Sequence, residues 1–563
     1  EMSYDITDPH NPENDEFVLS KGHAAPILYS CLYHAGAIKQ DLLSLRKFDS
    51  PLEGHPMPGS LNYIKVGTGS LGQGLGIGVG MALASKKLGK KNRTFVLLGD
   101  SEMAEGSVYE AMQLGAYYKL DRLVAILDAN RLGQSRETMV GHHVGEYEKR
   151  ARAFGWDAIV IDGHDISQVL EALKAERKSS KPLFIIAKTF KGKGVSFLEN
   201  KDGWHGKPVP KDRLEAALLE LPDMDFPKVE IAKPKGAGEE KVIPAKMKFT
   251  GYKMGEEVAT RQGYGSGLKN LAESNPRIIA IDAEVSNSTF SEKVRESEPD
   301  QYVEAFIGEQ NMIGMALGMS VKGFVPYAST FAAFLSRAFD QIRMGALSSA
   351  SFTVSGSHAG VSIGEDGASQ MGLEDIAMFR TLPNAKVFYP SDANATEKIV
   401  ELCSRLKGIK YIRTTRAKTP IIYSAGEEFP EGEFKVLKES AKDSVVLVGA
   451  GITLHEALLA HAKLKENGIN SAVIDLYCVK PFNKAKFAEF AKKHGSKVVV
   501  AEDHRRAGGM GEMLAAAVSG FGIEVKSLGV CGIPHSGKPE ELISAYGIDA
   551  KAIVDAAKKV AQG

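Results

Sequence analysis

Cysteine is scarce in this sequence, and long apolar runs are missing from it. The 563 residues include four cysteines, which stand far apart and show no metal-ligand spacing: Cys31, Cys403, Cys478 and Cys531. Such usage is typical of reduced thiols, so we expect a cytoplasmic protein. Because no apolar run approaches the length of a membrane helix, we expect no membrane partner.

An excess of charge is missing as well. The chain carries 70 basic and 70 acidic residues, which gives a formal net charge of zero. This balance argues against a dominant nucleic-acid-binding surface, although it is compatible with a local basic pocket. A hydrophobic content of 43% and a charged content of 25% are ordinary for a globular protein. The length predicts about three domains.

The most informative pattern in the sequence consists of two apolar runs, each of which is followed by a polar residue. The run 94–98 leads to Asp100, and the run 123–127 leads to Asn130. Residues 108–120, between the runs, have a helical pattern. A right-handed strand–helix–strand crossover would place both strand ends side by side at the carboxyl edge of a parallel sheet, where ligands bind.

The side chains of Asp100 and Asn130 carry hard oxygen donors. Such donors suit an octahedral divalent cation such as Mg²⁺, which in turn binds a diphosphate. The alternative is that both residues only cap turns, which both residue types do well. The motifs around them favour the cation.

Apolar runs alternate with helical patterns along the whole chain, and this alternation predicts an α/β fold with mostly parallel sheets. The predicted strands form three groups: 94–99, 123–128, 158–162 and 183–187; then 277–282, 324–328, 351–355, 386–389 and 410–413; then 445–448, 472–476, 497–501 and 524–528. Helices are expected between the strands, notably at 331–344 and 372–382. Three successive patterns predict three consecutive α/β domains.

Further motifs precede and follow the Asp100–Asn130 pair. Their sequences are SKGHAAP at 20–26, GSLGQG at 69–74, KTFKGKG at 188–194 and WHGKP at 204–208. Together with the pair, they resemble the transketolase family, and the resemblance extends along essentially the whole chain. It implies a diphosphate-binding domain at 1–221, a pyrimidine-binding domain at 251–430 and a C-terminal domain at 431–563. Residues 222–250, rich in Lys, Pro, Gly and Glu, would be an exposed linker.

The resemblance implies thiamine diphosphate and Mg²⁺ as cofactors, with Ca²⁺ or Mn²⁺ as substitutes for the magnesium. Asp100, Asn130 and the backbone carbonyl of Leu132 would hold the metal. Contacts to the organic cofactor would come from His23, Gly69, Leu71, Ser101, Asn130, Lys191, His205, Glu309 and Phe334. Ser101 stands where the family usually has glycine. This replacement keeps the backbone N–H but leaves less room between the backbone and a bound phosphate.

The resemblance also implies roles in catalysis. Glu309 would bond to the aminopyrimidine ring, on which Phe334 would stack. His23, His55 and His205 would transfer protons at the reacting carbons, because imidazoles titrate near neutrality. Taken singly, Glu309 would more readily be an acid in the first turn of a helix, and Phe334 a core residue.

A sugar phosphate would be bound by a larger set of residues. By resemblance, this set contains His205, Arg261, Ser288, His358, Asp366, Gln370 and Arg416. The two arginines offer bidentate geometry to a phosphate, although each alone would more readily form a surface ion pair. Asp366 would select hydroxyl stereochemistry in the donor sugar. Gln370 is typical of mammalian transketolases, whereas many microbial enzymes have His there.

The expected function is therefore that of a transketolase. A two-carbon ketol (glycolaldehyde) unit would pass reversibly from a ketose phosphate such as xylulose 5-phosphate to an aldose phosphate such as ribose 5-phosphate, in the non-oxidative pentose phosphate pathway. The enzyme would be an obligate homodimer with active sites at its interface. Two alternatives stay open: an enzyme like 1-deoxyxylulose-5-phosphate synthase, and a non-catalytic transketolase-like binding protein. Residues 204–206 and 364–370 favour transketolase.

One segment that is usual in the transketolase family has no equivalent near the first residues of this sequence. The chain begins Glu1-Met2-Ser3-Tyr4, whereas transketolases usually carry a preceding segment with a Gly-His-Pro motif. We expect either a truncated or incompletely recorded chain, or half of a split enzyme whose partner is a separate amino-terminal polypeptide. Any targeting signal would lie in that segment.

Overall fold

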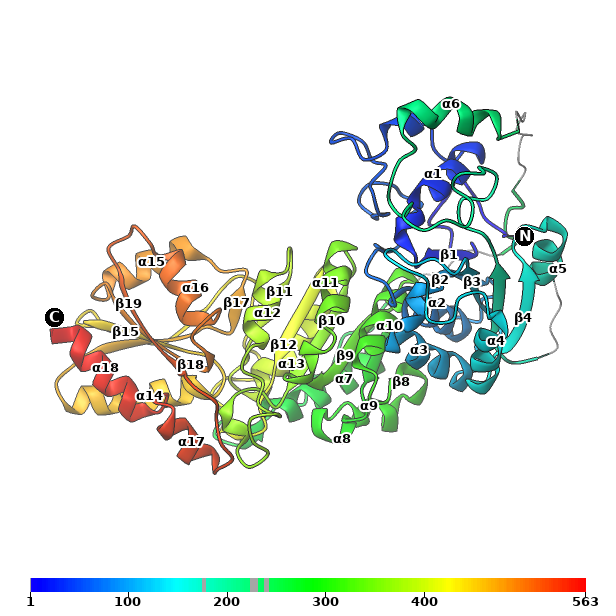
Figure 1. Ribbon diagram of the computed structural model, residues 1–563. Helices are drawn as coiled ribbons and strands as arrows, with labels where there is room; N and C mark the ends of the chain where they lie inside the picture. The colour runs from blue at the N-terminus through cyan, green and yellow to red at the C-terminus, as the bar shows by residue number, and fades with distance from the viewer. Residues whose placement is uncertain (1, 175–178, 223–230, 237–241, 563) are drawn as a thin grey trace. The chain divides into compact units, whose positions relative to one another are not determined.

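The computed structural model describes residues 2–174, 179–222, 231–236 and 242–562 (Figure 1). The chain forms two compact units. The first unit contains Glu1–Lys241, Gln310–Phe324 and Leu347–Ser349, and the second contains Val242–Glu309, Val325–Ala346 and Ala350–Gly563. No helix within the described ranges is both long and apolar enough to span a bilayer.

The first unit is built on a five-stranded sheet in the order β1-β2-β3-β5-β4, with all neighbours parallel. The strands are β1 (Glu16–Leu19), β2 (Thr94–Gly99), β3 (Leu123–Ala129), β4 (Asp157–Asp162) and β5 (Leu183–Lys188). Its helices are α1 (Ala25–His34), α2 (Gly74–Lys87), α3 (Gly106–Tyr117), α4 (Val144–Ala153), α5 (Ile166–Lys174) and α6 (Lys211–Leu219), with the short helices η1 (Gly22–Ala24), η2 (Leu42–Ser44) and η3 (Ser101–Ala104). The central strands are almost continuously apolar, as expected for a parallel sheet that is buried on both faces.

Helix α2 packs unusually closely against α10 (Glu309–Val321) in the first unit. A Cβ atom on Gly80 would lie 2.4 Å from the backbone oxygen of Met315. Glycine is therefore required at this position, because the two helix backbones meet without space for a side chain.

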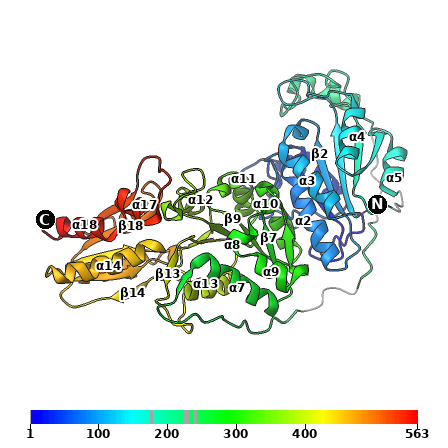
Figure 2. The same cartoon turned by 90° about the horizontal axis from the view of Figure 1, so that it is seen from below.

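The second unit contains a seven-stranded sheet in the order β17-β11-β12-β10-β9-β7-β8. The strands are β7 (Ile278–Asp282), β8 (Tyr302–Glu304), β9 (Val325–Phe331), β10 (Phe352–Ser357), β11 (Lys386–Phe388), β12 (Ile409–Arg413) and β17 (Cys478–Lys480), and a separate short pair joins β6 (Glu257–Ala259) to β13 (Lys418–Pro420). The helices are α7 (Thr260–Ser274), α8 (Ser286–Thr289), α9 (Glu292–Ser297), α11 (Phe339–Leu347), α12 (Asp375–Thr381) and α13 (Ala393–Arg405), with η4 (Pro299–Gln301), η5 (Phe334–Ser336) and η6 (Val361–Ile363). Helices α7 and α13 lie side by side (Figure 2).

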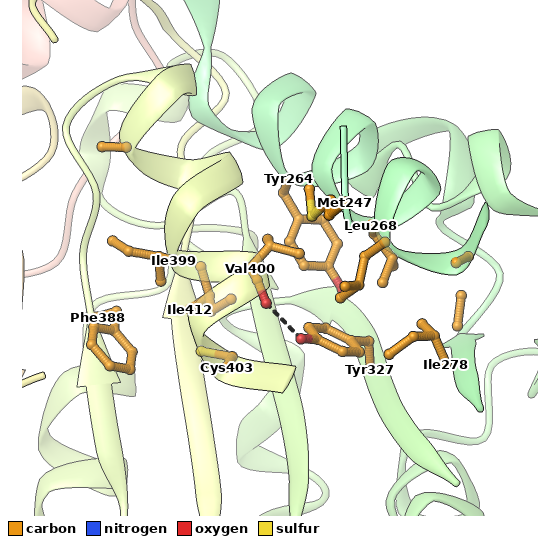
Figure 3. Packing of buried hydrophobic residues seen from close by; sticks show 14 of the residues in the cluster. Met247, Tyr264, Leu268, Ile278, Tyr327, Phe388, Ile399, Val400, Cys403 and Ile412 are labelled. Carbon is orange, nitrogen blue, oxygen red and sulfur yellow. Dashed lines mark hydrogen bonds between the residues drawn. The ribbon is translucent and has the colours of Figure 1, made fainter. Parts of the chain in front are cut away.

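Aromatic and aliphatic side chains from α7, α13 and the strands form the core of this sheet (Figure 3). Tyr264, Leu268 and Ile399 are fully buried there. The hydroxyl of the buried Tyr327 donates a hydrogen bond of 2.6 Å to the backbone oxygen of Val400 (Figure 3). The one polar atom of that tyrosine is thus satisfied inside the core.

A third sheet follows in the second unit, in the order β14-β16-β15-β18-β19. Its strands are β14 (Lys435–Lys438), β15 (Val445–Gly449), β16 (Ser471–Asp475), β18 (Lys497–Arg505) and β19 (Glu524–Val530), and its helices are α14 (Ile452–Glu466), α15 (Lys484–Lys493), α16 (Met510–Ala517), α17 (Pro539–Ala545) and α18 (Ala550–Gln562). All neighbours are parallel except β14 and β16. The predicted α/β class with mostly parallel sheets is confirmed.

Strand β17 is one of the elements that join the last two sheets. It lies beyond residue 430 in sequence, yet it pairs with β11 in the seven-stranded sheet, with Phe388 opposite Cys478. A strand supplied by the last part of the chain therefore completes the preceding sheet. The domain boundaries at 221, 250 and 430 stay predictions.

Two predicted helices begin later than expected, and part of the predicted linker is buried. The helix expected at 331–344 is wrong at its start, because β9 continues to Phe331 and α11 begins at Phe339. The helix expected at 372–382 begins at Asp375, since Gly372 forms a bridge with Ala359. Within the linker, Met247 is only 7% exposed and packs into the core of the second unit. Residues 223–230 and 237–241 of that linker lie outside the described residues.

Candidate functional site

The ends of β2 and β3 bring Asp100 and Asn130 to one edge of the first-unit sheet. The strands are neighbours, with Gly99 opposite Asp128. The backbone N–H of Arg131 donates to Oδ2 of Asp100 over 2.6 Å, and this bond connects the two strand ends directly. The predicted juxtaposition is present, since it follows from the parallel crossover.

The carboxylates at this edge are buried and differ in their electrostatics. Burial raises the pKa of Asp100, and the neighbouring Asp128 raises it further. Burial alone would also raise the pKa of Asp128, but the ammonium of Lys21, at 2.5 Å, lowers it. Lys21 and Asp128 are thus part of the site, although the sequence analysis assigned them no role. The position of Lys21 in the 20–26 motif was the available signal.

The donor set at this edge fits a hard divalent cation. A carboxylate oxygen of Asp100, Oδ1 of Asn130 and the carbonyl oxygen of Leu132 are the donor types that Mg²⁺ prefers. Nζ of Lys191 donates a hydrogen bond of 3.3 Å to that carbonyl. Across the described ranges, no three His, Cys, Asp or Glu side chains gather as a metal cluster. The arrangement therefore does not favour zinc, which prefers nitrogen and sulfur ligands.

A group of histidines lies in the same unit. The rings of His23 and His205 are 4.9 Å apart, and Nζ of Lys191 is 3.0 Å from Nδ1 of His205. Burial, followed by the charge of Lys21, lowers the pKa of His23 to about 4. Burial and Lys191 lower the pKa of His205 as well. The expectation that these imidazoles titrate near neutrality is therefore wrong for His23, because desolvation and nearby ammonium groups keep it neutral.

The 69–74 loop packs against this histidine group. Gly69 has a φ of +130°, and a Cβ there would lie 2.9 Å from Cδ2 of His55. A glycine is required because the loop backbone and the His55 ring occupy the space where a side chain would stand. Leu71 lies in the same loop and is half-buried. At Gly69, the loop therefore presents its backbone to the His55 ring.

A buried carboxylate that the sequence analysis missed connects three of the motifs. Glu102 accepts hydrogen bonds from Gly72 N over 2.7 Å, from Gly99 N over 3.0 Å and from the hydroxyl of Ser20. Burial raises the pKa of Glu102, whereas these donors lower it. Ser101, beside it, donates its backbone N–H to Asp100 over 2.8 Å. The backbone N–H of Ser101, which was expected to face phosphate, is thus hydrogen-bonded to the Asp100 carboxylate.

The second unit contains a separate cavity of about 500 Å³. It is lined by Arg261, Ser288, Phe331, His358, Asp366, Gln370 and Arg416. Six of these residues are the second-unit residues that were predicted to bind substrate, and Phe331 is the one that was missed. Strands β9, β10 and β12 lead into this lining at their carboxyl ends, which is where α/β sheets bind ligands.

Two guanidinium groups dominate the charge of this cavity. Nη1 of Arg261 donates to the carbonyl oxygen of Ser288 over 3.0 Å, while its buried Nε has no hydrogen-bond partner among the described residues. Nη1 of Arg416 lies 3.0 Å from Oδ2 of Asp366. Burial, then Arg261 and Arg416, lower the pKa of His358 to about 3. The cavity thus offers two cations and one neutral imidazole to an anion.

Glu309 and Phe334 lie in the second unit but do not line this cavity. The side chain of Glu309 is 3% exposed, and its Oε2 lies 2.9 Å from Nη1 of Arg337, whose side chain is 60% exposed. The ring of Phe334 stacks on Phe331 with centroids 5.3 Å apart, and Phe331 stacks on His358 at 3.9 Å. A continuous aromatic stack therefore leads from Phe334 to the cavity wall.

The predicted site residues thus fall into two groups. The first unit holds His23, His55, Gly69, Leu71, Asp100, Ser101, Asn130, Leu132, Lys191 and His205. The second unit holds Arg261, Ser288, Glu309, Phe334, His358, Asp366, Gln370 and Arg416. Their individual roles stay predictions.

Comparisons with known proteins match the whole chain. Family models described as the transketolase thiamine diphosphate binding, pyrimidine binding and C-terminal domains match residues 1–226, 256–421 and 432–553. "Transketolase-like protein 2" of Mus musculus is 48% identical, and "Transketolase" of Homo sapiens is 47% identical; each match covers 99% of this chain and 90% of the relative. The crystal structure of transketolase from Campylobacter jejuni has the same fold, with a TM-score of 0.85 at 23% identity, over 98% of this chain and 92% of that one.

The depressed pKa of His358 predicts that this residue stays neutral at physiological pH. Its value of about 3 lies below the 6.5 of an unhindered imidazole, so the neutral form predominates throughout pH 5–8. We expect its Cε1–H NMR resonance to be flat over that range, with a His358→Asn variant providing the assignment. Because the folded pKa is the lower one, the linked stability is present above pH 6.5 and is lost as the pH falls toward 3. A titration midpoint near 6.5 in the folded protein would contradict this prediction.

Proposed function

The chain belongs to the transketolase family of thiamine-diphosphate-dependent enzymes, and from this premise we propose that it transfers a two-carbon ketol unit reversibly between sugar phosphates. The donor would be a ketose phosphate such as xylulose 5-phosphate, and the acceptor an aldose phosphate such as ribose 5-phosphate, as in the non-oxidative pentose phosphate pathway. The observation that supports this substrate class best is the second-unit cavity. It joins Arg261, Arg416 and a neutral His358, which together suit a phosphate dianion.

The first-unit residues fit the diphosphate end of the cofactor. Asp100, Asn130 and the carbonyl of Leu132 would hold Mg²⁺, and Lys191 would face the diphosphate charge. When bound, thiamine diphosphate supplies the nucleophilic carbon and the electron sink that carbon–carbon cleavage needs. The protein would bind this group and orient it.

Three histidines would transfer protons at the substrate oxygens. Because burial and the nearby ammonium groups keep His23 neutral, its ring can accept a proton from a hydroxyl and return it later. His205 lies 4.9 Å away from it and accepts a hydrogen bond from Lys191, which orients the ring. His55 borders the same space, where it can donate to or accept from a carbonyl or hydroxyl.

Glu309 is the best candidate for a carboxylate that acts on the cofactor ring. It is buried at the start of α10, and the aromatic ring of Phe334 lies in the same unit. A buried carboxylate can exchange a hydrogen bond with a ring nitrogen without competition from water. Its present partner is Arg337, at 2.9 Å.

A second candidate function is that of a transketolase-like binding protein without turnover. The similarity to "Transketolase-like protein 2" supports keeping it, because that printed name specifies no reaction. An enzyme like 1-deoxyxylulose-5-phosphate synthase has no specific observation in its favour. A cytoplasmic location and a separate amino-terminal polypeptide stay predictions.

A coupled ketol-transfer assay tests the proposed function. With xylulose 5-phosphate, ribose 5-phosphate, thiamine diphosphate and Mg²⁺, we expect formation of sedoheptulose 7-phosphate. Glu309→Gln should lower kcat by about 100-fold or more, since it removes an acid–base group, while the melting temperature stays within a few degrees. Glu296→Gln, at an exposed position of α9, is the matched control and should keep full activity. Cofactor binding without product would favour the binding-protein alternative.

We further propose a homodimer in which each cofactor is held by two protomers. Asp100 would serve the diphosphate end in one protomer, and Glu309 would serve the pyrimidine end in the other. Mixing inactive Asp100→Ala protomers with inactive Glu309→Gln protomers should then restore activity. Random exchange gives mixed dimers in half of the population, each with one intact site of two, which is about a quarter of wild-type activity.

The control for this mixing experiment is each variant exchanged with itself, which should stay inactive. If each site were built within one protomer, every site of the mixed dimer would contain one substitution. No recovery of activity, with subunit exchange verified by mass spectrometry, would contradict the shared-site arrangement.

A further inference from the structure

The second-unit cavity contains one internal anion among its cations. Of its seven lining residues, Asp366 is the single acid, and its Oδ2 lies 3.0 Å from Nη1 of Arg416. Both side chains are partly exposed, at 39% for Asp366 and 37% for Arg416. Arg261, the other guanidinium, has a backbone carbonyl as its partner and a buried Nε without one among the described residues. The cavity therefore has one cation, Arg416, that is paired with a carboxylate and one, Arg261, that is bonded to a carbonyl instead.

We propose that Asp366 occupies Arg416 in place of a phosphate, and that the phosphate group of a substrate displaces it. The released carboxylate then accepts a hydrogen bond from a hydroxyl of the same substrate. Phosphate binding and hydroxyl recognition are thereby coupled, so that Asp366 recognises the sugar hydroxyl when a phosphate occupies Arg416. This inference rests on the proposed sugar-phosphate substrates.

The energetics of the pair allow this exchange. A partly exposed ion pair of this kind favours the paired state by about five-fold at most in equilibrium constant. Little binding free energy is therefore lost when Asp366 leaves Arg416. A phosphate brings about two negative charges and three acceptor oxygens, against one charge on the carboxylate. It can contact Arg261 and Arg416 together, because both line the same cavity. The incoming anion is therefore the stronger partner for Arg416.

Arg416 has a second contact that keeps it in place during the exchange. Its Nη1 also donates to the carbonyl oxygen of Ile363 over 3.2 Å. The guanidinium thus remains at the cavity wall when the carboxylate leaves. His358 adds no charge, because burial and both arginines lower its pKa to about 3. The competition is therefore between one carboxylate and one phosphate for the two guanidiniums.

The first test is calorimetric and needs no turnover. Titration with inorganic phosphate should show tighter binding to Asp366→Asn than to the wild type, by up to about five-fold, because the competing carboxylate is gone. Glu401→Gln removes the acid of another partly exposed pair, with Arg405 at 2.7 Å in α13, and should bind phosphate as the wild type does. Arg416→Gln should weaken phosphate binding in both backgrounds.

The second test supplies the phosphate and the sugar as two separate molecules. In the wild type, inorganic phosphate should lower the KM for non-phosphorylated xylulose several-fold, because it releases Asp366 for the sugar hydroxyl. In Asp366→Asn, the KM should not respond to phosphate. A merely structural ion pair would not produce this dependence.

Two results would overturn the proposal. One is phosphate affinity in Asp366→Asn that is equal to or weaker than that of the wild type. The other is an increase of the xylulose KM with phosphate in the wild type, which would mean simple competition for one space. A protein that transfers no ketol unit would refute the proposed function, but the calorimetric comparison would still decide the role of Asp366.

Discussion

The first-unit site depends on one buried carboxylate. Glu102 is almost completely buried and accepts hydrogen bonds from backbone N–H groups in two segments and from the hydroxyl of Ser20. Each buried donor left without a partner would cost about 1–3 kcal/mol, so the three segments are held in one arrangement. That arrangement places the 69–74 loop beside His55 and fixes the turn that carries Asp100. Glu102 therefore helps to fix the geometry of this edge from behind the residues that were predicted to bind the cofactor.

Much of the fold could be predicted because the relevant signals are local. Most apolar runs of the parallel sheets became strands within one or two residues of their expected bounds, as in β2 and β15. The strands β9 and β18 continue three and four residues beyond the expected ends, to Phe331 and Arg505. The errors occur where a tertiary contact determines the end of an element or the sheet to which it belongs. Phe331 ends a strand rather than starting a helix, because it stacks on His358 at the cavity wall. Strand β17 joins a sheet far from it in sequence, which no local pattern indicates.

The candidate site shows the same division between local and tertiary information. The resemblance identified residues that carry chemistry in motifs, such as Asp100 and Arg416. It gave no indication of the residues that position them, such as Glu102 and Lys21, because their function depends on partners distant in sequence. The residue type alone also gave the wrong charge state for His23, whose pKa of about 4 results from burial and two ammonium groups. A motif identifies the type and position of a residue, whereas the charge state of that residue depends on the groups that surround it.

The most direct test of the central claim is Mg²⁺-dependent binding of thiamine diphosphate, measured by calorimetry on the wild type and on Asp100→Ala. We predict that Mg²⁺ strengthens cofactor binding in the wild type and that Asp100→Ala loses at least about ten-fold of this effect, as expected for removal of a metal ligand. Glu146→Gln, an exposed acid of α4, should behave as the wild type does. An equal Mg²⁺ dependence in Asp100→Ala would contradict the assignment of the β2–β3 edge as the metal and diphosphate site.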